Sequence, residues 1–335
     1  MILVTGGTGL VGAHLLFNLT SSNKKVRATY RSKTSLEEVA KIFSYYTDNT
    51  TLLFDKIEWI KADILDIPSM ELAFKNITEV YHAAALISFN PRDFKSLQKV
   101  NIEGTANIVN LCLAHKVKKL CYVSTIGAIG RSAKGTDANE ETEWTEQYAN
   151  VYALSKYEAE LEVWRGSQEN LDVVIVNPGI IVGPGNWKSG SGKLFATAFK
   201  GYRYYPPGGS GFVTVNDVVK SMVALMEASI TNERFILVGE NLSYQEILYR
   251  LALKLGKKPP TKQLKVWQLQ LLRYMDWIKS WVVSSERKIT KNSIYALLHP
   301  EHYSNKKIKQ ELNFEFDSLD ATIALSCEKF IEEHS

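Results

Sequence analysis

The stretch "MILVTGGTGLVG", residues 1–12, joins a short apolar run to a glycine-rich turn that opens an expected helix over 10–22. Gly6, Gly9 and Gly12 are separated by two-residue gaps. A dinucleotide diphosphate needs backbone N–H groups at a helix N-terminus and no Cβ where the backbone approaches it. A strand before such a turn and a helix after it favour a binding role over a merely flexible turn. We therefore predict that the turn binds a dinucleotide through these residues: Gly6, Thr8, Gly9, Leu10, Val11 and Gly12.

Beyond this turn, β-rich runs and helical patterns alternate along the first half of the chain. Several strand candidates are continuous apolar runs, as expected for strands buried on both faces of a parallel sheet. Strands are predicted at 1–5, 25–30, 57–62, 79–85, 118–125 and 171–177. Helices are predicted at 10–22, 36–47, 69–75, 93–115 and 145–169. The alternation predicts an α/β fold, a Rossmann-type doubly wound parallel sheet.

The pattern changes near residue 177, where loops rich in Gly, Pro and Ser begin. We expect a dinucleotide-binding domain over 1–176, to which 212–239 returns. The remainder, 177–211 and 240–335, is expected to form a smaller, mostly helical substrate-binding lobe. Within it, "SYQE" fits a capping box that opens a helix, with Ser243 and Glu246 as the pair.

Composition narrows the class of protein. The 335 residues include 40 basic and 36 acidic side chains, without a Lys/Arg-rich block, so we expect no nucleic-acid partner. No apolar run is long enough for an integral membrane segment. Three cysteines lack metal or redox spacing, so no metal is expected. With no secretory signal pattern at the start, these features favour the cytoplasm.

The end of the second expected strand bears on the choice of nicotinamide cofactor. An acidic residue there would bind the ribose 2′-OH of NAD, whereas an arginine suits the 2′-phosphate of NADP. The sequence has Tyr30 followed by Arg31, Ser32 and Lys33, and no carboxylate. We therefore predict NADP, with NAD possible if Arg31 is only a solvated charge.

"VYALSKYEAE", residues 151–160, places Tyr152 one helical turn before Lys156. Such a pair is either a surface aromatic–cation contact or a catalytic acid with its electrostatic helper. With the glycine turn and the strand-end "YVST", the sequence resembles the extended short-chain dehydrogenase/reductase family. The closest resemblance is to its dihydroflavonol reductase, hydroxysteroid dehydrogenase and NAD-dependent epimerase/dehydratase branch. "ADILD", "HAAA", "VNIEGTANIV", "NPGIIVGPG" and "FVTVNDVV" follow in the family's order.

The resemblance implies roles for further residues. It places Thr125, with Ser124 as the alternative, at the catalytic hydroxyl, and assigns the nicotinamide ribose to Lys156. The other cofactor contacts that it implies are Asp63, Ile64, Ala83, Ala84, Ala85, Tyr152, Pro178 and Gly179. Asn177 departs from the arginine that many relatives carry. Pairing through 93–115 and 145–165 would give a homodimer.

Together these features predict an enzyme that reduces a ketone, or oxidises the alcohol, on a fairly apolar small molecule. An ammonium beside Tyr152, with the oxidised nicotinamide, is expected to lower the pKa of the phenol. A nucleotide-sugar epimerase or dehydratase, and a non-catalytic NADP(H)-sensing protein, are the alternatives.

Three features have structural as well as functional interpretations. His82 is expected to be structural, and the acidic run 137–146 to be solvated, with Glu140 or Glu141 as a possible substrate contact. A helix at 266–283 carries one apolar stripe of Trp267, Leu271, Tyr274, Ile278 and Trp281. We expect the stripe to be buried in the lobe's core; a lid over the substrate and peripheral membrane contact are the alternatives.

Overall fold

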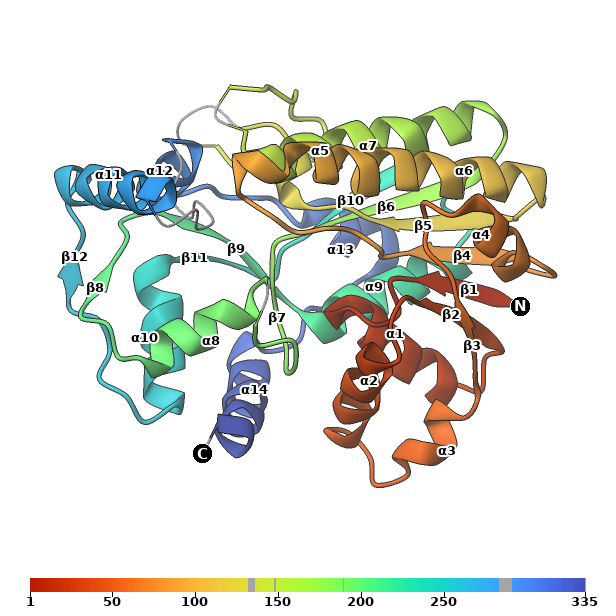
Figure 1. The fold of residues 1–335 in the computed structure, drawn as a ribbon, viewed down its shortest axis with the longest axis horizontal. Helices are drawn as coiled ribbons and strands as arrows, with labels where there is room; N and C mark the ends of the chain where they lie inside the picture. Colours follow the sequence, from red (N-terminus) through yellow and green to blue (C-terminus); the bar gives the residue numbers. More distant parts are fainter. Residues whose placement is uncertain (132–135, 148, 189, 283–290, 335) are drawn as a thin grey trace.

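The computed structural model describes residues 1–131, 136–147, 149–188, 190–282 and 291–334, with the side chains of 278–282, 291 and 292 excepted. Its centre is a seven-stranded parallel sheet in the order β10-β6-β5-β4-β1-β2-β3 (Figure 1). The strands are β1 (Ile2–Thr5), β2 (Val26–Tyr30), β3 (Ile57–Lys61), β4 (Glu79–His82), β5 (Lys119–Val123), β6 (Asp172–Pro178) and β10 (Glu233–Leu237). This is the doubly wound α/β sheet that the sequence predicts.

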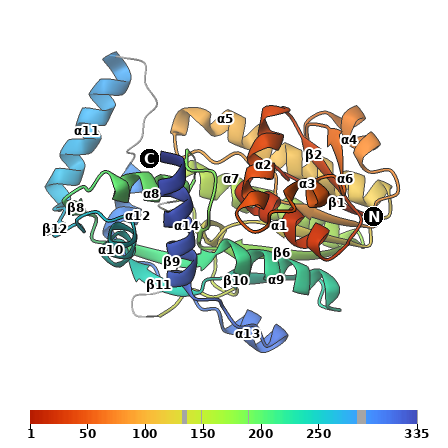
Figure 2. The ribbon, with the colours of Figure 1, turned by 90° about the horizontal axis from the view of Figure 1, so that it is seen from below.

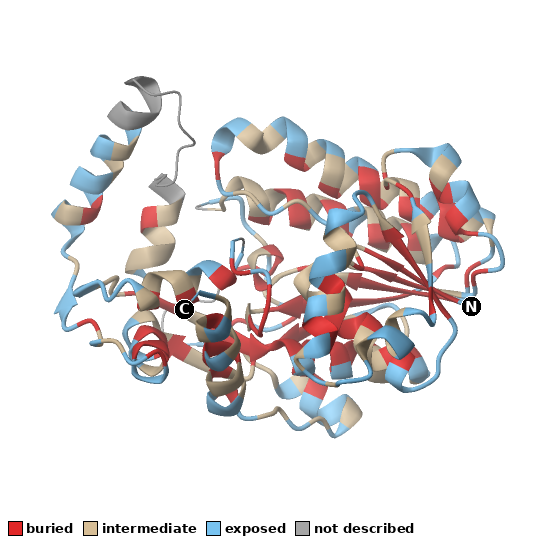
Figure 3. Ribbon diagram, turned by 60° about the horizontal axis from the view of Figure 1, so that its bottom comes forward, coloured by how far each residue is buried: buried red, intermediate tan, exposed pale blue. Residues whose placement is uncertain are grey.

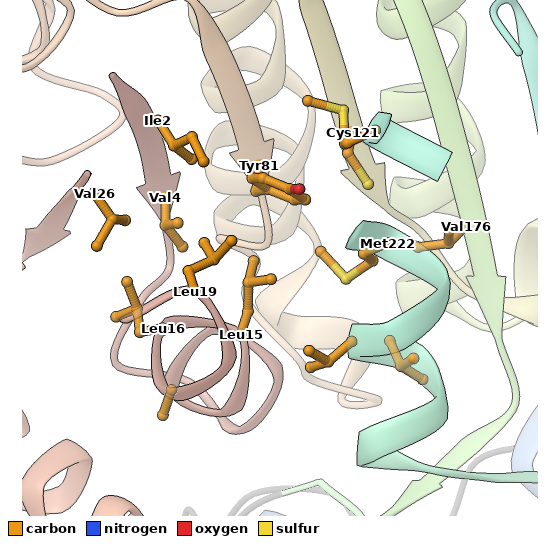
Figure 4. Close-up of a cluster of buried hydrophobic side chains, with 14 of the residues drawn as sticks. Ile2, Val4, Leu15, Leu16, Leu19, Val26, Tyr81, Cys121, Val176 and Met222 are labelled. Atoms are coloured by element: carbon orange, nitrogen blue, oxygen red, sulfur yellow. The ribbon is translucent and has the colours of Figure 1, made fainter. Parts of the chain in front are cut away.

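Helices cover both faces of the sheet. One face packs on α1 (Leu10–Ser21) and α9 (Val215–Glu227), where Leu15, Leu16 and Met222 are fully buried (Figure 4). The other packs on α4 (Ile67–Ala73), α6 (Gly104–Ala114) and α7 (Val151–Gln168). The inner strands are almost entirely buried, whereas the edge strand β3 buries only Ile57 (Figure 3). This explains their continuous apolar sequence.

The remaining N-terminal helices are α2 (Thr34–Ser44), α3 (Thr50–Phe54) and α5 (Phe94–Leu97). The helix expected over 93–115 consists of three consecutive segments. A π-helical turn at Gln98–Glu103 joins α5 to α6. The helix expected from 145 begins instead at Val151. The side chain of Asn150 caps it by accepting a hydrogen bond from the backbone N–H of Ala153 over 2.8 Å.

The C-terminal part of the chain forms a second body beside the sheet (Figure 2). It contains a three-stranded sheet, β11-β9-β7, and a two-stranded one, β12-β8. These strands are β7 (Ile180–Val182), β8 (Tyr204–Tyr205), β9 (Gly209–Thr214), β11 (Glu240–Ser243) and β12 (Lys262–Gln263). The helices of this part of the chain are α8 (Gly192–Phe199), α10 (Tyr244–Lys254), α11 (Val266–Val282), α12 (Lys291–Leu298), α13 (Lys306–Leu312) and α14 (Leu319–His334). Of these, α13 packs on β10 of the main sheet.

Two details refine the expected boundaries. Within the segment 212–239, which is expected to return to the dinucleotide-binding domain, residues 212–214 end β9 of the three-stranded sheet. In contrast, α9 packs on the main sheet and β10 belongs to it. The capping box at the start of α10 is present, because Ser243 and Glu246 exchange hydrogen bonds with each other's backbone. The loops that follow β1, β2, β4, β5 and β6 all leave the same edge of the parallel sheet, and this edge carries the candidate site.

Candidate active site

The glycine turn after β1 has the geometry of a diphosphate cradle. Gly6 has a φ of +71°, and a Cβ on it would lie 2.5 Å from the backbone nitrogen of Ala84. A Cβ on Gly12 would lie 2.1 Å from the carbonyl oxygen of Gly6, so both positions exclude any larger residue. Gly9 precedes α1, and a Cβ on it would meet only one atom, at 3.4 Å. The backbone at Gly9 is therefore open on its outer side, next to the unpaired N–H groups of Leu10 and Val11.

Further along the same edge lie the residues expected to contact the adenosine part of a dinucleotide. Arg31 is exposed directly after β2, and no described contact ties its guanidinium to another residue. Asp63 follows β3, and its carboxylate accepts a hydrogen bond from the backbone N–H of Leu65 over 3.0 Å. Ile64 is buried against Gly104 on α6, so its side chain serves the core at least as much as any ligand.

The alanine loop and the Pro-Gly turn occupy neighbouring strand ends. Ala83 and Ala84 lie against Gly6, which brings the first and fourth strand ends into contact. Ala85 is exposed beyond them. Pro178 is buried at the end of β6. A Cβ on Gly179 would lie 2.4 Å from the carbonyl oxygen of Gly211, so packing on β9 alone requires glycine there.

Tyr152 lies in the first turn of α7, beside the loop that follows β4. The ring of Phe89, which is about half exposed, meets the Tyr152 ring edge-on with centroids 5.7 Å apart. The π-helical turn helps to hold this part of α7. It carries the buried Asn101, whose amide donates to the hydroxyl of Ser155 over 2.9 Å and bonds the backbone of Leu86.

Lys156 is buried one turn beyond Tyr152, with its ammonium group directed at β5. Its Nζ donates to the hydroxyl of Tyr122 over 2.6 Å and to the carbonyl oxygen of Val123 over 2.7 Å. The Nζ also lies 4.1 Å from the centre of the Tyr122 ring. Tyr122 is therefore a site neighbour that the sequence analysis missed, although "CYVST" includes it.

The acid–base properties differ from the expectation for Tyr152. Burial raises the pKa of its phenol to about 12, because the phenolate would lose solvation. Burial likewise lowers the pKa of Lys156 to about 7, with Glu160 partly opposing the shift. The expected lowering of the phenol pKa by the ammonium is thus not found in this structure. The ammonium is directed at Tyr122 and Val123, and desolvation is the larger effect.

The two candidate hydroxyls after β5 have different surroundings. Ser124 is buried, and its hydroxyl lies beside the carboxylate of Glu160. Thr125 is partly exposed, and its Oγ1 accepts the backbone N–H of Gly127. A Cβ on Gly127 would lie within 3.4 Å of both Thr125 and Ala153, so this strand end packs on the turn that carries Tyr152. Thr125 is thus the more accessible of the two hydroxyls.

A buried polar network lies behind Lys156, and the sequence analysis did not find it. Glu160 accepts a hydrogen bond from the amide of Asn177 over 2.6 Å, and the same amide donates to the carbonyl oxygen of Thr125 over 3.0 Å. The guanidinium of Arg234, on β10, lies 3.6 Å from Glu160. A cation thus faces Glu160 from β10, although β6 carries Asn177 rather than arginine. The only sequence signal of this network was Asn177 itself, which stands where many relatives carry an arginine.

Two other candidates have structural roles. His82 is fully buried between Thr5 and Thr105, at 2.6 and 3.0 Å, and burial lowers its pKa to about 3. Glu140 is buried rather than solvated. Its carboxylate accepts the N–H of Ile236 on the edge strand β10, so it is not free to contact a substrate. Glu141 is exposed.

The expectation that the aromatic stripe of α11 is buried is wrong where its side chains are described. Trp267, Leu271 and Tyr274 are each more than half exposed. Ile278 and Trp281 lie outside the described side chains. Within the described ranges, no helix has the length and apolar character needed to cross a bilayer. In the same ranges, no three His, Cys, Asp or Glu side chains gather as a metal site would require.

Comparison with known proteins agrees with this geometry. The profile of the NAD dependent epimerase/dehydratase family matches residues 2–239. The chain is 27% identical over 331 residues to a putative dihydroflavonol 4-reductase of Synechocystis sp., covering 96% of this chain and 92% of that one. It is 30% identical over 267 residues to sterol demethylase protein B of Methylococcus capsulatus, covering 77% and 75%.

Among solved structures, the crystal structure of gox2253 superimposes with a TM-score of 0.82 at 26% identity, over 99% of this chain and 98% of that one. The fold, the ordered motifs and the extent of the profile match lead to one conclusion. The chain belongs to the NAD dependent epimerase/dehydratase family, within the extended short-chain dehydrogenases/reductases, which are NAD(P)-dependent enzymes.

Proposed function

We propose that the protein is an NADP-dependent reductase of a ketone on a fairly apolar small molecule, with Tyr152 as the proton donor. The observation that carries the proposal is the environment of Tyr152. Its raised pKa keeps the phenol protonated at neutral pH, and the exposed ring of Phe89 lies against it. A protonated phenol beside an apolar surface suits the delivery of a proton to a carbonyl oxygen on an apolar molecule.

The cradle around Gly9 fits a dinucleotide, because the backbone is open there and meets the N-terminus of α1. When bound, the nicotinamide supplies the hydride that the carbonyl carbon accepts. In our proposal Tyr152 then passes its proton to the carbonyl oxygen. The Thr125 hydroxyl donates a hydrogen bond that orients this oxygen, and Lys156 holds the ribose hydroxyls.

Preference for NADP rests on Arg31. The side chain is exposed at the end of β2 without a described partner, and the next two residues, Ser32 and Lys33, bring no acid. A free guanidinium there can pair with a 2′-phosphate through two parallel hydrogen bonds, whereas the 2′-OH of NAD gives it no charge to pair with. The other cofactor contacts proposed are those of the glycine turn and the strand ends described above.

The substrate is proposed to enter between the sheet edge and the lobe formed by 177–211 and 240–335. Ile87 and Phe89 are both about half exposed on the loop leading from the alanine segment. The Phe89 ring contacts the ring of Tyr152, and Ile87 lies two residues before Phe89. An apolar ring or chain beside the reacting carbonyl would cover these groups and gain the free energy of burying their surface.

Nucleotide-sugar epimerase or dehydratase activity is the second candidate, because the family includes such enzymes. The basic side chains of Lys188, Lys193, Lys200 and Arg203 favour it, since they follow the Pro-Gly turn and could meet a diphosphate. An epimerase retains its cofactor and returns the hydride, so it consumes no NADPH overall.

Absorbance of NADPH, followed with a panel of apolar ketones and aldehydes and with UDP- and dTDP-sugars, tests the proposal. We expect stoichiometric oxidation of NADPH with at least one apolar carbonyl compound and none with the sugars. Turnover of a nucleotide sugar without net oxidation of NADPH would assign the second candidate instead.

A further inference from the structure

The helix α11 has its apolar face turned away from the protein. Trp267, Leu271, Tyr274 and Met275 each expose between 51% and 60% of their surface. At 100° per residue these four positions fall within an arc of about 100° on one side of the helix. Leu269, on the opposite side, is 2% exposed. Val266, Leu272 and Trp277 are also exposed, outside this arc. The described part of α11 thus exposes most of its apolar side chains, unlike the usual amphipathic helix of a globular protein.

This helix also stands apart from the body of the molecule. It extends beyond the C-terminal lobe, with α12 as its neighbour, as two views show (Figures 2 and 3). Four bulky apolar side chains on one outward face form a contiguous patch, and such patches in soluble proteins mark contact surfaces. Trp and Tyr are the side chains enriched where an apolar phase meets water.

Basic residues are concentrated around the same helix. Lys262 lies in β12 and Lys265 just before α11; both are exposed. On the paired strand, Tyr204 is exposed beside Arg203. The segments 200–205 and 257–277 together hold seven basic residues and one acidic residue, which leaves 33 basic and 35 acidic residues in the rest of the chain. The net positive charge of the protein is therefore located at this end.

We infer that the outward face of α11, with the basic residues at its base, binds the surface of an anionic lipid membrane. A helix with aromatic and leucine side chains on one face and flanking lysines lies in the membrane interface, its apolar face in the headgroup region. Anionic headgroups attract the lysines and arginines beside it. A second copy of the chain would bring this positive charge against itself, which like-charge repulsion opposes.

The proposal goes beyond the reaction itself, because it says where the enzyme acts. A reductase held at a membrane surface would meet apolar substrates dissolved in the lipid. The membrane contact needs only the α11 surface. Its test therefore does not depend on which carbonyl compound is reduced or on whether NADPH or NADH is used.

Co-sedimentation of the full chain with vesicles tests the proposal. We expect binding to vesicles of phosphatidylcholine and phosphatidylserine, weaker binding to phosphatidylcholine alone, and release by high salt. Replacing Trp267→Ser and Tyr274→Ser together should lower the partition coefficient by about tenfold or more, because both rings would lose their burial in lipid. Far-UV circular dichroism and NADPH binding of the variant should equal those of the wild type.

Two control pairs make the test specific. Tyr249 and Leu253 are exposed to a similar degree on α10, so Tyr249→Ser with Leu253→Ser should leave vesicle binding unchanged. Lys262→Gln with Lys265→Gln should weaken binding to the anionic vesicles alone. The matched control is Lys25→Gln with Lys118→Gln, at two exposed lysines just before β2 and β5, where these strands of the main sheet begin. It should leave binding to the anionic vesicles unchanged.

Three results would overturn the inference. The first is equal recovery of the wild type and the Trp267/Tyr274 variant with anionic vesicles. The second is a dimer in light scattering that this variant loses while vesicle binding persists, which would make the face an interface between copies. The third is a higher KM for an apolar ketone in the variant with vesicle binding unchanged, which would make α11 a lid.

Discussion

The Nζ of Lys156 donates a 2.6 Å hydrogen bond to the hydroxyl of Tyr122, and this contact fixes the ammonium at the end of β5. The same nitrogen bonds the carbonyl oxygen of Val123, the residue before the Ser124–Thr125 pair. These two bonds hold Lys156, and with it this part of α7, against the end of β5. The arrangement places the ammonium by strand contacts rather than by contact with Tyr152, and several consequences can be measured.

Replacing Tyr152→Phe should abolish most turnover while leaving NADPH affinity intact. The ring and its contact with Phe89 remain, and only the proton donor is lost, which costs on the order of 10²–10⁴ in kcat. Steady-state kinetics and fluorescence titration with NADPH measure the two effects. Tyr157→Phe, on the same helix, is the control and should retain full activity. Substantial turnover by the Tyr152 variant would remove this residue from its proposed role.

Replacing Glu160→Gln should move the alkaline limb of the pH–rate profile to lower pH. Glu160 raises the pKa of Lys156 against the lowering by burial. Without that negative charge the ammonium loses its proton at lower pH, and we expect a shift of about one unit. Glu160→Asp keeps the negative charge and should therefore move the limb part of the way back to its wild-type position. A profile identical to that of the wild type would show that Glu160 does not act through Lys156.

The stability of the fold should fall between pH 7 and pH 5. Burial lowers the pKa of His82 to about 3 and that of His14 to about 4. The unfolded chain, with histidine pKa values near 6.5, therefore binds more protons in this window, so unfolding becomes easier as pH falls. Each histidine contributes about 1.4 kcal/mol per pH unit below 6.5. Urea unfolding at both pH values measures the change.

His82→Asn isolates one of these contributions. The variant will be less stable overall, because the bonds to Thr5 and Thr105 are altered. The informative quantity is the difference between its free energies of unfolding at pH 7 and pH 5. This difference should be smaller than that of the wild type by about 2 kcal/mol. An equal difference would mean that His82 is protonated in the folded protein.

Replacing Arg31→Ser should change the choice of cofactor. Loss of the guanidinium removes a charge-assisted contact with a 2′-phosphate, for which we expect a rise in KM for NADPH of about tenfold or more. The KM for NADH should change little. Lys33→Ser, two residues further on, is the control for general loss of positive charge. Equal changes for both cofactors would contradict a role of Arg31 in selecting NADP.

The parallel sheet and the glycine turn after its first strand could be predicted from sequence because local signals define them. Continuous apolar runs mark the buried strands, and the glycine spacing marks the turn before α1. The boundaries were less predictable. Residues 83–85 resemble a continuation of β4, but the strand ends at His82, where the chain turns to pass Gly6.

Long-range contacts had no local signal. Arg234 lies 74 residues beyond Glu160, and the two meet only because β10 pairs with β6. The periodicity of α11 predicted one apolar face, and its described members Trp267, Leu271 and Tyr274 are exposed. Period alone cannot say whether that face is turned toward the core or away from it, because both orientations have the same spacing.

The transfer of hydrogen from cofactor to substrate tests the central claim most directly. The wild type, supplied with NADPH deuterated at the transferable position and an apolar ketone, should yield an alcohol with one deuterium on the former carbonyl carbon. The oxygen-bound proton should come from Tyr152 and exchange with water, and the Tyr152→Phe variant should form almost no labelled alcohol. No labelled alcohol from the wild type, together with conversion of a nucleotide sugar while the NADPH remains unconsumed, would contradict the assignment as a carbonyl reductase.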